Sequence, residues 1–141
     1  MDNDNDKNLF EIRIDEASKR FIRKIHPLVS ISFIANVLLA VTIVCVSIYS
    51  LKIQRRIPVD SIRGFYLRVY PVYTIIYTLI ATAGGYYYFL YVKNLRKAVV
   101  LSDEGLFNKS FKYVYLNAIF FTIAMVMAFL FSVFQVLAIW A

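Results

Sequence analysis

Charged residues are missing from three long stretches of this 141-residue chain, and their absence decides the class of protein. Residues 27–51, 69–92 and 113–141 contain no Asp, Glu, Lys or Arg. A helix at the surface of a soluble domain needs a polar face, and none of these runs has one. About 20 apolar helical residues cross a bilayer core of roughly 30 Å, and the runs hold 25, 24 and 29 residues. We therefore expect an all-α membrane protein with transmembrane helices at about 27–51, 69–92 and 113–140.

Residues that carry out chemistry are also scarce. The chain has one histidine, His26, and one cysteine, Cys45, so nothing suggests a His/Cys metal site or an intrachain disulfide. There is no glycine-rich phosphate loop, and the adjacent acids Asp103 and Glu104 are better explained as helix-capping residues than as a catalytic pair. The sequence predicts no enzymatic activity, no cofactor and no metal. Cys45 is expected to be a small apolar packing residue.

The segment before the first run differs from the rest of the chain. Residues 1–8 are strongly polar and are expected to be disordered. Residues 9–26 place Phe10, Ile14, Phe21 and Ile25 within one arc of a helix, with most of the basic residues off that arc. This pattern fits a short amphipathic helix on the cytoplasmic surface, or a solvated extension of the first span. A secretory signal is excluded, since its basic region is short and its apolar core is shorter than this run.

The distribution of basic residues predicts the orientation in the membrane. Six lie before the first run, five between the first two runs and five between the last two, with none at the C-terminus. A cytoplasmic N-terminus therefore places 6 + 5 = 11 basic residues inside and 5 outside. The opposite orientation reverses these numbers. Because cytoplasmic loops are enriched in Lys and Arg, we expect the N-terminus in the cytoplasm and the C-terminus outside.

Capping signals indicate where the second and third helices begin. Ser61 follows a Pro-containing turn and is expected to cap the second helix, with Pro71 either kinking it or marking a start after Tyr70. His26-Pro27 is expected at the first turn of the first span. Residues 102–104, Ser-Asp-Glu, read as a cap followed by first-turn acids. The last two runs should thus form a long helical hairpin with its tip near Ser102, within a three-span domain of residues 27–141.

Polar and small residues gather on one face of each expected span. Hydroxyl and amide groups in hydrocarbon need hydrogen-bonding partners, and small residues let helix backbones approach closely. We expect these faces to turn toward one another or toward a neighbouring subunit, leaving most Phe, Val and Ile of the third span to lipid. The predicted packing residues are Ser32, Asn36, Ala40 and Ser47 in the first span, Tyr73, Tyr77 and Gly84 in the second, and Asn117, Ala124, Ala128 and Gln135 in the third.

A tyrosine-rich interior could instead line a pore or a pocket for a lipid or quinone. Ordinary interhelical packing explains it more simply, because several of these tyrosines also lie at the heights where an aromatic belt forms. Ion-coupled transport usually requires an ionisable group at membrane depth, and the runs contain none of the four charged residue types.

Residues 86–98, YYYFLYVKNLRKA, end an aromatic helix in a basic segment, and Ser102-Asp103-Glu104, Leu106, Phe107, Phe111 and Lys112 lead into the next helix. This arrangement resembles a family of small uncharacterised membrane proteins, a domain of unknown function common in Bacteroidota. The resemblance covers roughly residues 84–134 and is weaker over 15–50. Gly105 in the first helical turn and Val99-Val100 before the cap depart from the family pattern. The resemblance implies a helical inner-membrane protein and brings no known activity, cofactor or catalytic residue.

The sequence therefore predicts a small bacterial plasma-membrane protein that acts as a non-enzymatic interaction or assembly subunit. Its expected partners are the lipid bilayer and a second protein or further copies of itself, and not nucleic acid, because basic loops beside anionic lipid account for the net charge of +7. Lys93, Arg96 and Lys97 form the expected cytoplasmic basic patch. A homo-oligomeric channel or pore-forming effector is the alternative.

Overall fold

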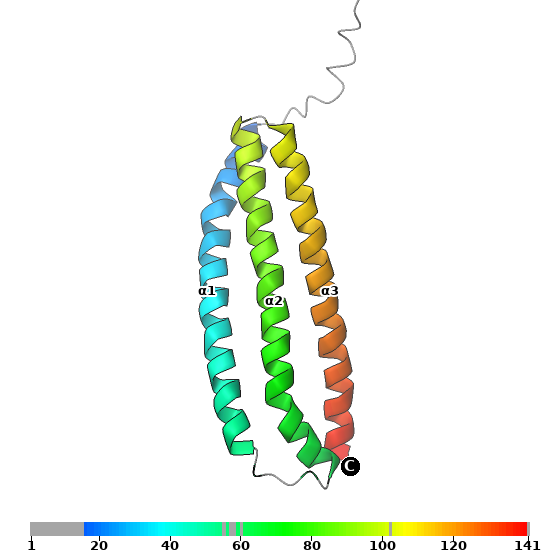
Figure 1. The fold of residues 1–141 in the computed structure, drawn as a ribbon. Coiled ribbons are helices and arrows are strands. Elements are labelled where there is room, and N and C mark those ends of the chain that lie inside the picture. The colour runs from blue at the N-terminus through cyan, green and yellow to red at the C-terminus, as the bar shows by residue number, and fades with distance from the viewer. Residues whose placement is uncertain (1–15, 55, 57–58, 60, 102, 141) are drawn as a thin grey trace, which may run out of the picture.

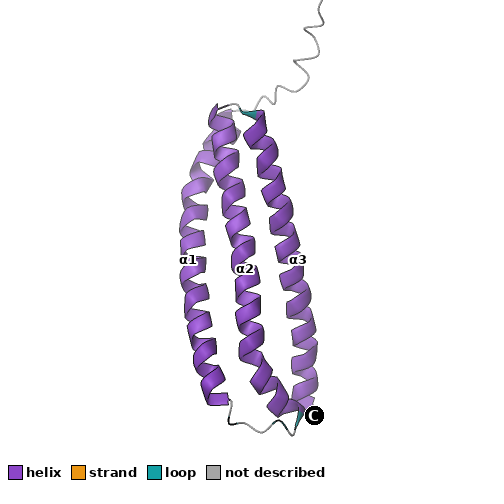
Figure 2. Ribbon diagram, viewed as in Figure 1, coloured by secondary structure: helices purple, strands orange, loops and turns teal. Residues whose placement is uncertain are grey.

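The computed structural model describes residues 16–54, 56, 59, 61–101 and 103–140, and in this part of the chain it is built from three long α-helices (Figures 1 and 2). They are α1 (Glu16–Gln54), α2 (Ile62–Leu101) and α3 (Glu104–Trp140). All three are long and apolar enough to cross a membrane, which confirms the predicted fold class. The segment expected to be disordered, residues 1–8, lies outside the described residues.

Each helix extends beyond its apolar run. Residues 16–26 are the first turns of α1 and pass into the span without a break in the helix, whereas residues 9–15 of the predicted amphipathic segment lie outside the described residues. Pro27 thus lies inside α1, so the prediction that it opens the helix is wrong. Proline leaves the carbonyl of Arg23 without its helical N–H donor, and outside the apolar run water can hydrate that carbonyl. One turn along the helix from His26, the Ser30 hydroxyl donates a hydrogen bond to the His26 backbone carbonyl (2.8 Å).

The caps of the second and third helices fix the hairpin. The Ser61 hydroxyl accepts a hydrogen bond from the Gly64 N–H (3.0 Å), which confirms Ser61 as the cap of α2. At α3 the capping side chain is Asp103 and not the predicted Ser102, because the Asp103 carboxylate accepts the Leu106 N–H (3.0 Å) and the helix begins at Glu104. Glu104 follows in the first turn, where a negative charge stabilises the helix N-terminus.

Pro71 lies within α2 and is fully buried, so a helix start after Tyr70 is wrong. Its ring removes the hydrogen bond to the Leu67 carbonyl, and proline is the commonest cause of a helix bend. In Figure 1 the first half of α2, which contains Pro71, bends toward α3. Pro71 therefore shapes the end of the hairpin at which α3 finishes.

Helix α2 lies between the other two helices (Figure 1). It packs against α1 along one side and against α3 along another, whereas the described residues of α1 and α3 make no contact with each other. The end where α1 begins and α2 turns into α3 carries residues 16–26, 93–101 and 103–112, and we call it the hairpin end. The opposite end is called the Trp140 end.

Candidate functional site

The contact between α2 and α3 centres on one hydrogen bond at membrane depth. The Asn117 side-chain N–H₂ donates to the backbone carbonyl of Gly84 at 2.8 Å. A carbonyl has two lone pairs, so this one can accept from Asn117 besides its helical donor. The helices are close here, because a Cβ placed on Gly84 would lie 3.3 Å from the Cβ of Phe120. The absence of a side chain at Gly84 is therefore what lets Asn117 reach the backbone.

Aromatic rings pack on both sides of this hydrogen bond. Toward the Trp140 end, the rings of Tyr73 and Phe131 stack with centroids 3.7 Å apart and planes 7° apart. Tyr66 also contacts Phe131, with centroids 5.3 Å apart. Toward the hairpin end, Tyr87 stacks on Phe120 with centroids 5.3 Å apart. These ring contacts join α2 to α3 along the length of the hairpin.

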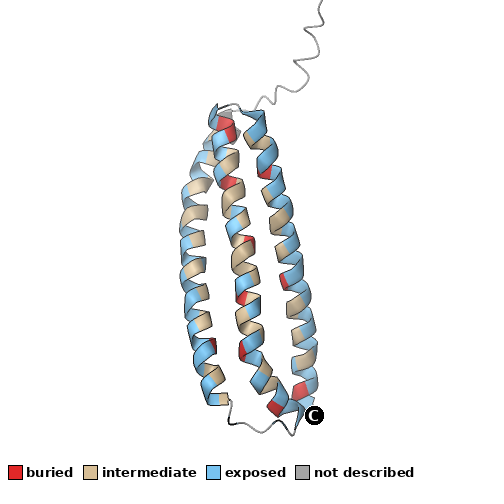
Figure 3. Cartoon of the chain, in the orientation of Figure 1, coloured by how far each residue is buried: buried red, intermediate tan, exposed pale blue. Residues whose placement is uncertain are grey.

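The predicted packing residues divide into those that are buried or partly buried and those that are exposed (Figure 3). Ser47, Gly84 and Ala124 are buried, and partial burial describes Ala40, Tyr73, Tyr77, Asn117 and Ala128. The structure brings Gly84 and Asn117 into direct contact. Ser32, Asn36 and Gln135 are exposed within a single chain. Cys45 is exposed as well.

Sequence reasoning missed Phe120, Phe131 and Phe134, which pack against α2 tyrosines, although most Phe, Val and Ile of the third span are exposed. It also missed a row of residues on α2 spaced by seven. The row runs through Gly64, Pro71, Thr78, Gly85, Val92 and Val99, and all of these except the partly buried Gly85 are buried. The signal was available in the sequence, because a repeat of seven marks the side of a helix that packs against a supercoiled neighbour.

At the hairpin end, α1 and α2 are joined through a histidine and an arginine. The Arg96 Nη1 lies 3.1 Å from the His26 Nδ1. Arginine can only donate, so the histidine Nδ1 accepts and the ring is neutral. Burial, then the charges of Arg96 and Lys93, lower the pKa of His26 below its usual range. Neutral His26 thus acts as a hydrogen-bond acceptor that holds the Arg96 guanidinium against α1.

The predicted basic patch is exposed at this end. Lys93, Arg96 and Lys97 are all exposed on the last turns of α2. The Lys93 ammonium lies 5.9 Å from the centre of the Phe89 ring, within the range of a cation–π interaction. Phe89 in turn stacks on Phe33 of α1, with ring centroids 5.1 Å apart. Two interhelical contacts, one polar and one aromatic, therefore hold α1 and α2 together below the patch.

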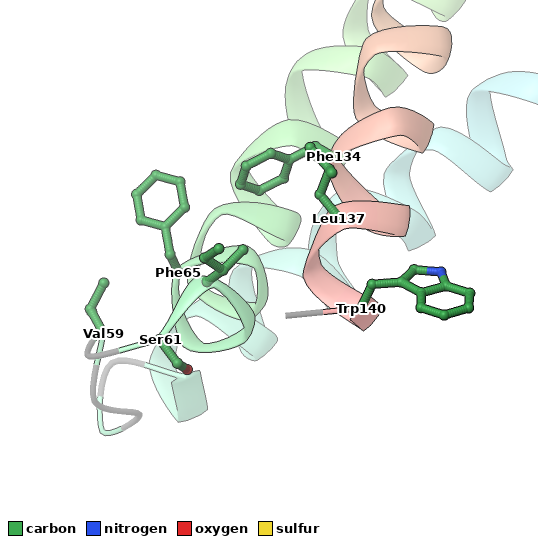
Figure 4. Close-up of a pocket in the computed structure, with 7 residues that line it drawn as sticks. Val59, Ser61, Phe65, Phe134, Leu137 and Trp140 are labelled. Atoms are coloured by element: carbon green, nitrogen blue, oxygen red, sulfur yellow. The ribbon is translucent and has the colours of Figure 1, made fainter.

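An open hollow of about 700 Å³ lies at the Trp140 end (Figure 4). Its walls are almost wholly apolar and come from Val59, Ser61, Ile62, Phe65, Phe134, Leu137 and Trp140. The Ser61 hydroxyl already accepts the Gly64 N–H, and the Trp140 ring is 87% exposed. An open apolar wall with an exposed tryptophan is typical of the membrane–water interface.

Within the described ranges, no three His, Cys, Asp or Glu residues lie together as a metal site would require. Comparison with protein-family models, curated proteins and solved structures finds no match to this chain.

Proposed function

We propose that this chain is a three-span integral protein of the bacterial plasma membrane that acts as a non-enzymatic interaction or assembly subunit. It binds further transmembrane helices, either of a partner protein or of other copies of itself. Its N-terminus and hairpin end face the cytoplasm, which agrees with the excess of basic residues on that side. The resemblance to small inner-membrane proteins supports the same location.

The observation that carries this proposal is the exposed Asn36 amide. Asn36 lies well inside the apolar run 27–51, and in the described part of the chain it makes no hydrogen bond. An amide facing hydrocarbon without a partner costs several kcal/mol by transfer scales, so a polar partner lowers the free energy. Gln135 of α3 is exposed in the same way. Because α1 and α3 each contact only α2, both have room for another helix.

An association test compares Asn36→Leu with Ile34→Leu, a matched control at another exposed position of the same helix. We expect the wild type and Ile34→Leu to run as complexes larger than one chain in mild detergent, or to crosslink to other proteins in membranes. The double variant that carries both Asn36→Leu and Gln135→Leu should run as a single chain and should form no crosslinks. If the double variant assembles as the wild type does, the proposal fails.

A homo-oligomeric channel is the second candidate, and one observation favours it. Ser32 and Asn36 are one turn apart on α1 and both are exposed, so copies of α1 arranged in a ring could line a conduit with polar groups. Single-channel currents from the purified protein in a planar bilayer would support this function. A discrete dimer or a mixed complex without conductance would support the interaction subunit.

A further inference from the structure

We propose that His26, Lys93 and Arg96 form a binding site for a phosphate group, carried by an anionic lipid, between α1 and α2 at the hairpin end. The inference rests on the proposed function only in that it places this end at a membrane surface. Arg96 Nη1 and His26 Nδ1 are 3.1 Å apart and join residues 70 positions apart in the sequence. The site therefore belongs to the packed helix pair and not to the α2 segment alone.

His26 holds the guanidinium of Arg96 in place but accepts only part of its hydrogen-bonding capacity. A guanidinium has five N–H donors in a fixed fork, and His26 accepts one of them. The Arg96 side chain is exposed, so its other donors can reach a ligand. A phosphate presents oxygens in the geometry that this fork binds through two parallel hydrogen bonds. His26 thus acts as a positioning residue, while Arg96 and Lys93 bind the anion.

Positive charge gathers at this point. Both electrostatic influences on His26, from Arg96 and Lys93, lower its pKa, and in the described part of the chain no carboxylate opposes them. On α1 itself, Arg23 precedes His26 by three residues, which places it on the same side of the helix. A bound phosphate would neutralise part of this positive charge.

The depth of the site favours a lipid headgroup over a soluble acidic peptide. Lys93 directly follows the apolar run that ends at Val92, so its ammonium lies at the level where headgroup phosphates are found. Below it, the stacked rings of Phe33 and Phe89 form an apolar floor against which an acyl chain can lie. One lipid would then satisfy the cations with its phosphate and cover the rings with its chain.

The first test measures lipid retention by native mass spectrometry after release from nanodiscs that contain phosphatidylcholine and phosphatidylglycerol. The wild type should retain phosphatidylglycerol in preference. Arg96→Gln should reduce that preference about tenfold, as expected for the loss of a charged hydrogen-bond donor. Lys109→Gln, which removes one charge from exposed α3 at the same end, is the matched control and should keep it. Equal losses in both variants would show a diffuse surface effect and overturn the site.

The second test uses His26 as a reporter, because it is the only histidine in the chain. Its pKa would be measured by NMR on protein purified through a histidine-free tag. We expect phosphatidylglycerol nanodiscs to raise this pKa above its value in phosphatidylcholine, and by more in the wild type than in Arg96→Gln. Adding inorganic phosphate to phosphatidylcholine nanodiscs separates the sources: no rise identifies the lipid headgroup, whereas an equal rise identifies a soluble phosphate and overturns the lipid assignment. The proposed function is tested separately through Asn36, so a wild type that assembles but shows no preference for phosphatidylglycerol sinks this inference alone.

Discussion

At the scale of single residues, two neighbouring glycines have different surroundings. A Cβ on Gly84 would meet the Cβ of Phe120 at 3.3 Å and the Asn117 amide nitrogen at 3.9 Å. A Cβ on Gly85 would meet nothing within 4 Å. Both positions are helical, so replacing either glycine by alanine gives the same gain in helix propensity, about 1 kcal/mol. The two substitutions therefore differ only in what the added methyl group contacts.

Gly84→Ala should be less stable than Gly85→Ala by about 1–3 kcal/mol, because the methyl group must push apart two helices whose near atoms cannot rotate away. It should also lengthen the Asn117 hydrogen bond to the Gly84 carbonyl. Equilibrium unfolding in mixed detergent and SDS micelles, followed by circular dichroism, measures the difference. Equal stability of the two variants would contradict the close approach at Gly84.

His26 should make the contact between α1 and α2 depend on pH. Its pKa is lowered in the folded protein, by burial first and then by Arg96 and Lys93, so the unfolded chain takes up a proton more readily. The stabilising effect of neutral His26 is fully present above its ordinary pKa of about 6.5 and is lost as the pH falls through the lowered value. Hydrogen exchange of the first turns of α1 should therefore quicken on acidification. A His26→Gln variant should show no such change over this pH range.

At the scale of helices, the spans and the Ser61 cap could be predicted, whereas the α3 cap was predicted one residue too early and the packing faces were predicted only in part. The faces were predicted for straight helices. On a straight helix Asn117 and Gln135 are five turns apart and lie on the same side. The observed line on α3 repeats every seven residues, through Ser110, Asn117, Ala124, Phe131 and Ala138. A straight helix drifts by about 20° per seven residues relative to such a line, and supercoiling removes the drift. Asn117 therefore lies on the observed line, and Gln135, farther along, is exposed.

The same reasoning explains the outcome on α1. Ala40 and Ser47 lie on a line of sevens with His26 and Phe33, which contact α2, and both are at least partly buried. Ser32 and Asn36 lie off that line and are exposed. The composition of one sequence does not reveal which neighbour each helix has, so the separation of α1 from α3 could not be foreseen. The number of spans could be predicted because the hydropathy of each helix depends on its own residues and not on its neighbours.

Asp103→Ala should weaken the start of α3. The Asp103 carboxylate accepts the Leu106 N–H, and removing a capping side chain typically costs about 1 kcal/mol. Asp103→Asn keeps a side-chain oxygen that can accept this hydrogen bond and serves as the control. Amide hydrogen exchange at residues 105–108 should be faster in Asp103→Ala than in the control. Identical exchange in both variants would show that the cap does not stabilise the hairpin tip.

At the scale of the whole molecule, the outer surface is apolar along the spans and charged at the ends. Exposed Leu, Ile, Val and Phe side chains cover the middle of all three helices. In lipid these side chains give no drive for the helices to associate, because the surroundings are as apolar as they are. Association must then come from close packing of small residues and from polar contacts, which here are the Asn117–Gly84 and Arg96–His26 pairs. Two such contacts, one on each side of α2, join the three helices of the chain.

The orientation of this molecule is testable with cysteines placed at its two ends. Val100 at the hairpin end and Ile62 at the other end of α2 are exposed and uncharged, so Val100→Cys and Ile62→Cys leave the 11-to-5 partition of basic residues unchanged. In a Cys45→Ala background, a membrane-impermeant maleimide should label Ile62→Cys in intact spheroplasts and Val100→Cys only after lysis. Wild-type Cys45, the natural control, should stay unlabelled in both, since it lies within the apolar run. The reverse pattern would place the basic hairpin outside, where the anionic cytoplasmic leaflet could not attract it.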